Sequence, residues 1–432
     1  MSTKTTFIAT GDSFMTRRLP EGGYPGFAEI QQIINDHDVR FNNLEITIHN
    51  QEGYPAAFSG GTWAMAEPEI LDDLNQYGFN LYNTANNHSF DYSCGGAVAT
   101  ARNLRQRNMV FAGTGETLLE ASAPAYLDTS NARVALVAAS SSFHESAAAG
   151  NRTASMIGRP GLNPLRFKTT YHVEQRYFDT LKEIADKTYM NAAKLESIAR
   201  GYSNPLPEDE LNFGGLSFKL DTKTEKHTVP LQKDMDRILA GICEARSQAD
   251  YVLVSIHAHI WEGLDTTAPA EFLKIFAHQC IDAGADAILG HGPHELQGIE
   301  IYKGKPIFYS LGNFIFQTET VRLQPADAFE NKGLPRDATV DELMDLRSKN
   351  GTCGYCVQEN IWRSVMAGFT AQDGKITQIQ LYPITLHMDA PRNKRGTPEL
   401  AKDDAVLHHL AKLSEPFGTK LRIENNVAFI DL

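Results

Sequence analysis

The segment NTANNHSFDY, residues 83–92, places amide, imidazole and carboxylate groups together at the end of an apolar stretch. Asn87 and His88 are adjacent, and Asp91 follows three residues later. An aspartate beside a histidine fixes the tautomer of the imidazole and raises its basicity. A polar turn without chemistry is the alternative interpretation. We interpret this segment as a candidate metal and acid/base site.

Polar residues with the same potential follow several other apolar runs that read as strands. They are Asp12, Glu45, His257, His259, His291 and His294. Strand ends in layered α/β proteins converge on one rim, so loops that are distant in sequence share a site there. We therefore expect these residues to lie close to Asn87 and His88.

Carboxylate, amide oxygen and imidazole ligands suit Mn²⁺, Fe²⁺, Zn²⁺ or Ca²⁺. In GHGPH, Gly290 allows a turn of the backbone and Pro293 stiffens the loop between two imidazoles. In SIHAH, an extended chain places His257 and His259 on the same side. His259 is then either a second ligand or a substrate contact.

Two further residues are candidates for contact with a substrate. Arg17 follows Asp12 closely and could bind an anionic group, although a solvated arginine is an equal alternative. Asn313 follows the run YSLG, where a turn could direct its side chain toward the rim. A plain β-turn is the alternative for Asn313.

The elements that must position these residues alternate between strands and helices, which is typical of an α/β layered domain. Residues 5–10 read as a strand that stops at Gly11-Asp12, and residues 27–36 as an amphipathic helix. Asp373-Gly374 predicts a hairpin turn between two C-terminal strands. We expect one domain over 1–432, with a lid-like insertion at 144–235 and a second excursion at 318–355.

The composition excludes several classes of protein. The net charge of −13 argues against nucleic-acid binding. The N-terminus has no long apolar region, and no run approaches the roughly 18 apolar residues that span a bilayer. Five cysteines, an odd number, favour a reducing compartment. We expect a cytoplasmic protein without a membrane anchor, whose oligomeric state the sequence does not specify.

Several motifs together resemble one family. In chain order they are TGDS, NLE, ANNHSFD, GTG, SIHAH and GHGPHELQGIEIYKGKPIFYSLGNF. They are similar to those of CapA-type poly-γ-glutamate synthesis proteins, and GRPGLNPLR resembles a longer, soluble branch of that family. The resemblance implies a calcineurin-like metallophosphoesterase fold, in which two facing β-sheets are flanked by helices and metals bind at the strand ends.

The resemblance also implies roles for individual residues. Asp12 would keep a ligand position, whereas Phe14 stands where the wider superfamily has a histidine. Glu45 would replace a bridging carboxylate. Asn87 would be a metal ligand and His88 the general acid. His257, and His291 with His294 in a motif one residue longer than usual, would complete a site for one or two divalent ions.

Three functions are compatible with this site. The first is a metal-dependent hydrolase of the phosphoesterase type, acting on a phosphoester or on a poly-γ-glutamate or peptide substrate with His88 and Asp91 as the acid/base pair. The second is a peptide epimerase that inverts Cα, as in lasso-peptide biosynthesis. The third is a non-catalytic scaffold for polymer synthesis.

Overall fold

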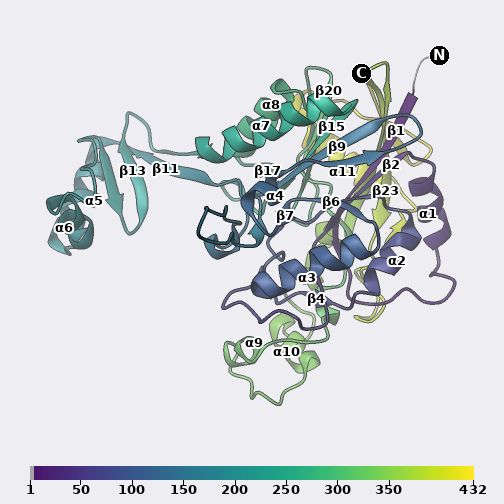
Figure 1. The fold of residues 1–432 in the computed structure, drawn as a ribbon, viewed down its shortest axis with the longest axis horizontal. Helices are drawn as coiled ribbons and strands as arrows, with labels where there is room; N and C mark the ends of the chain where they lie inside the picture. Colours follow the sequence, from purple (N-terminus) through teal and green to yellow (C-terminus); the bar gives the residue numbers. More distant parts are fainter. Residues whose placement is uncertain (1–3) are drawn as a thin grey trace. The chain divides into compact units, whose positions relative to one another are not determined.

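The computed structural model describes residues 4–432, which form a mixed α/β protein (Figure 1). Within these residues the chain divides into two compact units. The first contains residues up to Leu165, Lys233–Pro269 and Ala277–Leu432, and the second contains Arg166–Gln232 and Ala270–Phe276. No helix among residues 4–432 is long and apolar enough to cross a membrane.

Two large sheets form the first unit. A ten-stranded sheet within residues 4–432 has the order β25 (Arg422–Glu424), β26 (Val427–Asp431), β23 (Lys375–Thr385), β22 (Arg363–Gln372), β1 (Lys4–Phe14), β2 (Val39–Leu44), β5 (Leu81–Asn83) and β6 (Val110–Ala112). In addition β21 (Asn313–Phe316) pairs with β1, and β24 (Glu399–Leu400) pairs with β23.

The second large sheet has six strands within the same residues. Their order is β19 (Ile299–Tyr302), β20 (Lys305–Phe308), β18 (Ala287–His291), β15 (Tyr251–His257), β9 (Arg133–Ser140) and β8 (Ala125–Asp128). Phe7 and Phe369 of the ten-stranded sheet share one buried apolar cluster with Leu136, Leu253 and Phe308 of the six-stranded sheet. The two sheets therefore face each other, which confirms the predicted calcineurin-like class.

Helices cover the outer face of the ten-stranded sheet. A second buried cluster joins Ile8 and Tyr82 of this sheet to α1 (Phe27–Asn35) and α2 (Ile70–Tyr77). Ile30 and Ile34 of α1 are buried at the predicted helical spacing. Figure 1 shows α3 (Ser93–Gln106) on one side of the sheets and α7 (Gln232–Gln248) on the other. The remaining helices of this unit are α4 (Leu118–Ser122), α9 (Ala326–Glu330), α10 (Val340–Ser348) and α11 (Ala405–Ser414), while α8 (Glu271–Asp282) begins in the second unit.

The first strand is longer than the sequence predicts. β1 does not stop at Gly11-Asp12 but continues to Phe14, with a register irregularity between Ala9 and Asp12. The continuation is stabilised because Asp12 and Ser13 pair with β21 as well as with β2. A Cβ at Gly11 would lie 1.8 Å from the Gly312 carbonyl oxygen, so glycine is needed for this close approach.

The second unit has its own sheet, which the sequence analysis does not predict. Its order is β12 (Glu210–Phe213), β13 (Leu216–Leu220), β11 (Phe167–Val173) and β14 (Glu225–Pro230), accompanied by α5 (Gln175–Lys187) and α6 (Ala192–Ala199). This unit falls largely inside the predicted insertion at 144–235. The lid role of that insertion stays a prediction, as does the single-domain boundary.

Candidate metal centre

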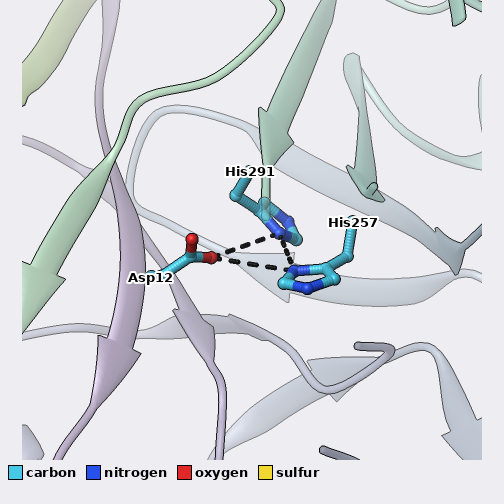
Figure 2. A group of neighbouring side chains, drawn as sticks. All are labelled: Asp12, His257 and His291. Carbon is cyan, nitrogen blue, oxygen red and sulfur yellow. Dashed lines mark hydrogen bonds and ion pairs between the residues drawn. The ribbon is translucent and has the colours of Figure 1, made fainter. Parts of the chain in front are cut away.

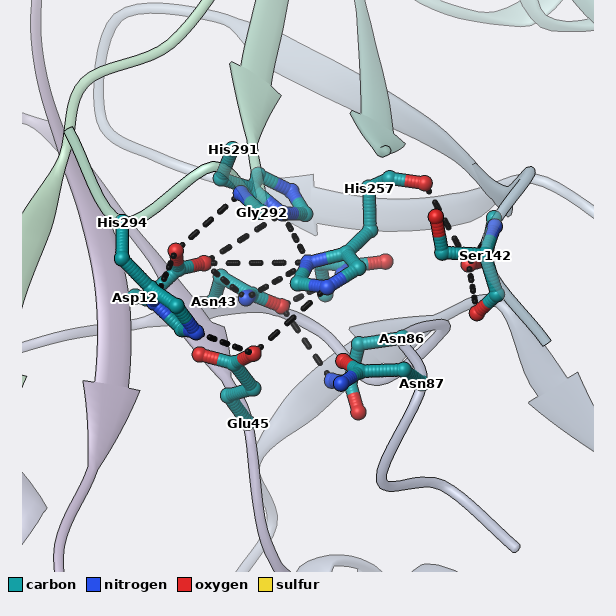
Figure 3. Close-up of polar contacts among 12 residues, drawn as sticks. Asp12, Asn43, Glu45, Asn86, Asn87, Ser142, His257, His291, Gly292 and His294 are labelled. Carbon is teal, nitrogen blue, oxygen red and sulfur yellow. Dashed lines mark hydrogen bonds and ion pairs between the residues drawn. The ribbon is translucent and has the colours of Figure 1, made fainter. Parts of the chain in front are cut away.

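The candidate ligands come from strand ends of both large sheets. Asp12 lies in β1 and Glu45 directly follows β2, while His257 and His291 are the last residues of β15 and β18. β1 and β2 pair in parallel, and so do β15 and β18, so each pair brings its carboxyl ends to one edge. Figure 3 shows these side chains and His294 pointing toward one another.

One group of possible ligands is Asp12, His257 and His291 (Figure 2). The Asp12 Oδ1 atom lies 3.7 Å from His257 Nδ1 and 3.6 Å from His291 Nδ1. The two Nδ1 atoms are 2.8 Å apart. All three residues are almost fully buried. Two imidazoles and a carboxylate that converge in this way form a donor set suited to a divalent transition metal.

Glu45 extends the cluster on its other side. Its Oε1 atom lies 3.5 Å from His257 Nε2 and 3.8 Å from both His259 Nε2 and His294 Nε2. Two further groups of possible ligands result, namely Glu45 with His257 and His259, and Asp12 with Glu45 and His294. Asp12, Glu45 and His257 each belong to two of the three groups, so the groups overlap and could hold one or two ions.

Neighbouring polar groups fix the orientation of these ligands. Ser255 Oγ lies 2.7 Å from His291 Nε2, so the Nδ1 atom of His291 is left to face Asp12. Asn313 donates through Nδ2 to the carbonyl oxygens of His294 and Ile361, so its Oδ1 must be the acceptor for His294 Nδ1 at 2.9 Å. His294 Nε2 is then directed toward Glu45. Such supporting hydrogen bonds orient metal ligands and tune their basicity.

Burial keeps three of the imidazoles neutral. Burial lowers the pKa of His259 to about 3 and that of His291 to about 4, and it lowers the pKa of His257 well below its usual range. Neutral imidazoles offer a lone pair to a metal without first losing a proton. His294 differs, because Glu45 and Asp12 outweigh its burial and raise its pKa to about 9.

The carboxylates also respond to their surroundings. Burial and the nearby Asp12 carboxylate raise the pKa of Glu45 well above its usual range. Burial acts on Asp12 in the same direction, but His294, His291 and the hydrogen bond from Asn43 outweigh it and lower the pKa of Asp12. Two carboxylates buried so close together form a site that a positive charge would stabilise, and a metal ion at His294 would take the place of the proton there.

The donor atoms fit a cation by a second criterion. Both carboxylate oxygens of Glu45 are buried and have no hydrogen-bond partner within residues 4–432, and the same holds for Asn87 Oδ1. A buried polar atom without a partner costs about 1–3 kcal/mol, and a charged one costs more. A divalent ion beside Glu45 would satisfy its two oxygens, so the residues of this cluster fit the predicted metal.

His88 and Asp91, which the sequence predicts to act together, are joined by a side-chain hydrogen bond. His88 Nδ1 lies 2.7 Å from Asp91 Oδ2, and both side chains are buried. The backbone amides of Gly60 and Ala64 donate to Asp91 at 2.9 and 2.8 Å. Burial raises the pKa of Asp91, while His88 and these amides act against that rise. The carboxylate therefore accepts the Nδ1 hydrogen of His88, so that Nε2 is the nitrogen not engaged by Asp91.

A pocket of about 450 Å³, which we call the site pocket, opens over this cluster. Asn87, His88, His259 and His294 all line it. Its walls include the aromatic pair Phe58 and His144, whose rings stack with centroids 4.1 Å apart, and the loop 59–62. Three residues of the 318–355 excursion complete the wall, namely Thr318, Arg347 and Tyr355. A molecule in the site pocket would lie against His88 and against two of the candidate ligands, His259 and His294.

The structure separates two predicted residues from the pocket. Arg17 lines another pocket, of about 520 Å³, which we call the arginine pocket. There its guanidinium donates to Thr320 Oγ1 and to the carbonyl oxygens of Arg392 and Arg395, and burial lowers its pKa to about 10. Asn313 is fully buried and holds His294, so contact of either residue with a substrate stays a prediction.

Four residues contribute to the site in ways that their sequence context does not predict. Gly60 approaches so closely that a Cβ there would lie 2.8 Å from His88 Nδ1 and from two Asn87 atoms, and the adjacent glycines of SGGT were the signal. Phe14 packs its ring edge-on against His88 at 5.1 Å, giving the imidazole an apolar wall. Arg347 and Tyr355 had no signal, because their segment reads as polar and turn-rich.

Comparison with known proteins identifies relatives over most of the chain. The profile of a family described as "Bacterial capsule synthesis protein PGA_cap" matches residues 6–318. "Uncharacterized protein y4sH" of Sinorhizobium fredii is 34% identical over 99% of this chain and 93% of its own length. "Capsule biosynthesis protein CapA" of Bacillus anthracis is 24% identical over 72% of this chain and 60% of its own length. "PGA biosynthesis protein CapA" of Bacillus subtilis is 34% identical over 32% of this chain and 37% of its own length.

Proposed function

The chain belongs to the bacterial capsule synthesis protein PGA_cap family, as its motifs predict, and from this premise we propose that it is a divalent-metal-dependent hydrolase of the phosphoesterase type. One observation carries the proposal. His88, which is held by Asp91, lines the same pocket as His259 and His294, which belong to groups able to hold an ion. An acid/base group beside a cation site is the arrangement that metal-assisted hydrolysis requires.

The proposed ligands are the six residues predicted from the sequence, and His259 adds a further donor. Asp12, Glu45, Asn87, His257, His291 and His294 would hold one or two ions of Mn²⁺, Zn²⁺, Fe²⁺ or Ca²⁺. When bound, such an ion supplies Lewis-acid polarisation of a substrate oxygen and lowers the pKa of water.

The chain's own residues supply proton transfer and orientation. Asp91 holds the Nδ1 hydrogen of His88, so the Nε2 atom donates a proton to a leaving group or accepts one. The Phe14 ring and the Gly60 backbone restrict the His88 imidazole from two further directions. The imidazole is therefore held in position before a substrate arrives, and the rate gains from this orientation.

The substrate class has two candidates. The fold class favours a phosphoester. The names of the Bacillus relatives refer to capsule and PGA biosynthesis, which supports a poly-γ-glutamate or related peptide substrate. Both kinds of substrate carry anionic groups, which a cation at this cluster would attract.

Hydrolysis is tested with p-nitrophenyl and bis-p-nitrophenyl phosphate and with γ-linked glutamate oligomers. We expect release of p-nitrophenol or of glutamate that EDTA abolishes and that Mn²⁺ or Zn²⁺ restores. Elemental analysis of purified protein identifies the resident ion, and Asp12→Ala and His257→Ala should lose it. Normal metal content in both variants would contradict the ligand assignment.

A peptide epimerase is the second candidate, and one feature favours it. His88 and His259 come from two different loops and both line the site pocket, so two proton-transfer groups face one substrate. Inversion at Cα needs a base and an acid on opposite sides of the carbon. Deuterium entry from D₂O at a peptide Cα without hydrolysis would establish this reaction. If no substrate turns over and His88→Ala keeps its function in cells, only the scaffold role remains.

A further inference from the structure

The wall of the site pocket has an uneven charge. Among residues 4–432 no aspartate or glutamate lines it, and Asp12, Glu45 and Asp91 are fully buried. Arg347 is its one lysine or arginine side chain among residues 4–432. The histidines that share the floor are held in the cluster. A ligand that enters the pocket therefore meets a single permanent positive charge on the wall and no negative charge at the surface.

The guanidinium of Arg347 also has no hydrogen-bonding partner among residues 4–432. Within the described part of the chain, neither a hydrogen bond nor an ion pair engages its side chain, and only its carbonyl oxygen accepts a weak contact from Cys353. Nearby arginines form ion pairs. Arg392 pairs with Asp345, which lies on the same helix as Arg347, and Arg336 pairs with Glu330 at 2.5 Å. Arg17 in the arginine pocket also lacks a carboxylate partner, but Thr320 and two carbonyl oxygens accept from its guanidinium. Arg347 has no such acceptor among residues 4–432.

The helix that carries Arg347 is firmly anchored. α10 begins with a capping box between Thr339 and Glu342, and its Leu343 and Met344 are buried. Leu343 belongs to an apolar cluster that also contains Trp63, next to the loop that clamps Asp91. Arg347 follows Leu343 by four residues and Met344 by three, so it lies one turn further along the same face. The packing of α10 thus sets where the guanidinium is presented.

We propose that Arg347 recognises an anionic group, a carboxylate or a phosphate, on the substrate bound over the metal centre; this inference rests on the proposed function. A guanidinium offers two parallel N–H donors that match both groups, and these charge-assisted bonds are about twice as strong as neutral ones. The alternative is that Arg347 binds no ligand and is a solvated arginine that interacts with the C-terminal end of its helix.

Chemical labelling tests the proposal without turnover. Full-length protein, with and without Mn²⁺, is treated with phenylglyoxal in the presence of phosphate, glutarate or the neutral analogue glutaramide, and modification is located by peptide mass spectrometry. We expect labelling of Arg347 to slow by about tenfold when the anion is present at ten times its dissociation constant. Arg336, exposed and ion-paired in the same segment, is the internal control.

The two anions distinguish the two sources of negative charge. Protection by phosphate alone identifies a phosphoryl group, and protection by glutarate alone identifies a carboxylate. Equal labelling of Arg347 in all conditions, or no labelling at all, overturns the proposal. Protection by glutaramide as strong as that by glutarate also overturns it, because shape rather than charge would then be recognised.

Arg347→Met and Arg347→Lys, with Arg336→Met as the matched control, separate this inference from the proposed function. Calorimetry should show anion affinity about 10- to 100-fold weaker in Arg347→Met, partial retention in Arg347→Lys and no change in the control. If Arg347→Met loses anion binding but wild type turns over no substrate, the proposed hydrolase function is contradicted and the anion-binding role of Arg347 is supported. If wild type and Arg347→Met turn over substrate with the same KM, the anion-binding role is contradicted and the hydrolase function is supported.

Discussion

The site pocket and the arginine pocket are of similar size but opposite character. The arginine pocket, of about 520 Å³, has Arg17, Arg18 and Arg322 in its wall. Arg18 donates to Asp73, Arg322 pairs with Glu67, and Arg17 is held by carbonyl oxygens. The site pocket, of about 450 Å³, has one arginine, and that arginine has no partner among the residues described.

The difference teaches that the number of charged side chains in a pocket does not indicate whether the pocket binds a ligand. In the arginine pocket, each guanidinium group is already engaged by protein groups through hydrogen bonds or ion pairs. At the site pocket, the wall contains Asn87 Oδ1 and the Arg347 guanidinium, neither of which has a partner among residues 4–432. The two unpartnered oxygens of Glu45 are fully buried and do not line the pocket. Buried polar atoms without partners are rare in native proteins, so each needs an explanation, such as a bound ion at Glu45 and Asn87. Both ring nitrogens of His49, in the wall of the arginine pocket, also have no hydrogen-bond partner among residues 4–432.

The largest effect is expected for His88→Ala. Removing the imidazole should lower turnover by about 10²–10⁴-fold, because proton transfer by a positioned side chain contributes on that order. Metal content should stay normal, since neither His88 nor Asp91 belongs to the groups that could hold an ion. Steady-state kinetics with elemental analysis measures both quantities. A variant that loses metal together with activity would show that His88 is a ligand instead.

His49, in the wall of the arginine pocket, is expected to affect stability instead of turnover. Burial lowers its pKa to about 4, below the ordinary value of about 6.5. Between pH 4 and pH 6.5 the His49 imidazole is protonated in the unfolded chain but neutral in the folded chain. The free energy of unfolding should therefore fall by about 3 kcal/mol from this residue as the pH drops from 7 to 4.

His49→Leu should remove that part of the pH dependence. Urea unfolding of wild type and variant at pH 7 and pH 4 isolates the contribution of His49, because all other groups are common to both proteins. Parallel pH profiles would show that His49 is protonated in the folded state and has a partner in the arginine pocket.

Asn313→Ala should weaken ion binding by about 10–100-fold, which is typical for loss of a residue that orients a metal ligand. Asn313 accepts from His294 Nδ1, so its loss frees the ring to turn away from Glu45. Competition with a fluorescent chelator measures the affinity. Asn103→Ala is the matched control, because Asn103 is a buried asparagine that donates to Ile48 O at 2.9 Å away from the cluster. Equal loss of affinity in both variants would indicate a general loss of stability.

The meeting of the candidate ligands was predictable from the sequence because each of them follows a local pattern. Each ligand sits at the end of a short apolar run, and parallel strands bring such ends together whatever their order. The meeting of Asp12 with His257 and His291 therefore requires only the correct class of fold. The continuation of β1 to Phe14 was not predictable, because it depends on pairing with β21, about 300 residues later in the chain.

The walls of the two pockets were much less predictable than the cluster. Arg17 follows Asp12 closely in sequence, but β1 extends to Phe14, beyond Asp12, and Arg17 lines the arginine pocket instead of the site pocket. Arg347 lies 335 residues from Asp12 and reaches the site pocket only because Leu343 and Met344 anchor α10. Neither position follows from a local pattern. The four-stranded sheet of the second unit was missed for a related reason, since its strands pair out of sequence order.

The smallest effect is expected for Arg322→Met in the arginine pocket. Arg322 pairs with Glu67, but both side chains are largely exposed, at 70% and 48%, so the pair is screened by solvent. Its loss should change the free energy of unfolding by less than about 1 kcal/mol and leave kcat and KM unchanged. Arg347→Met, by contrast, should raise KM for an anionic substrate. If Arg322→Met raises KM to the same degree, the arginine pocket also binds substrate, and the distinction between the two pockets fails.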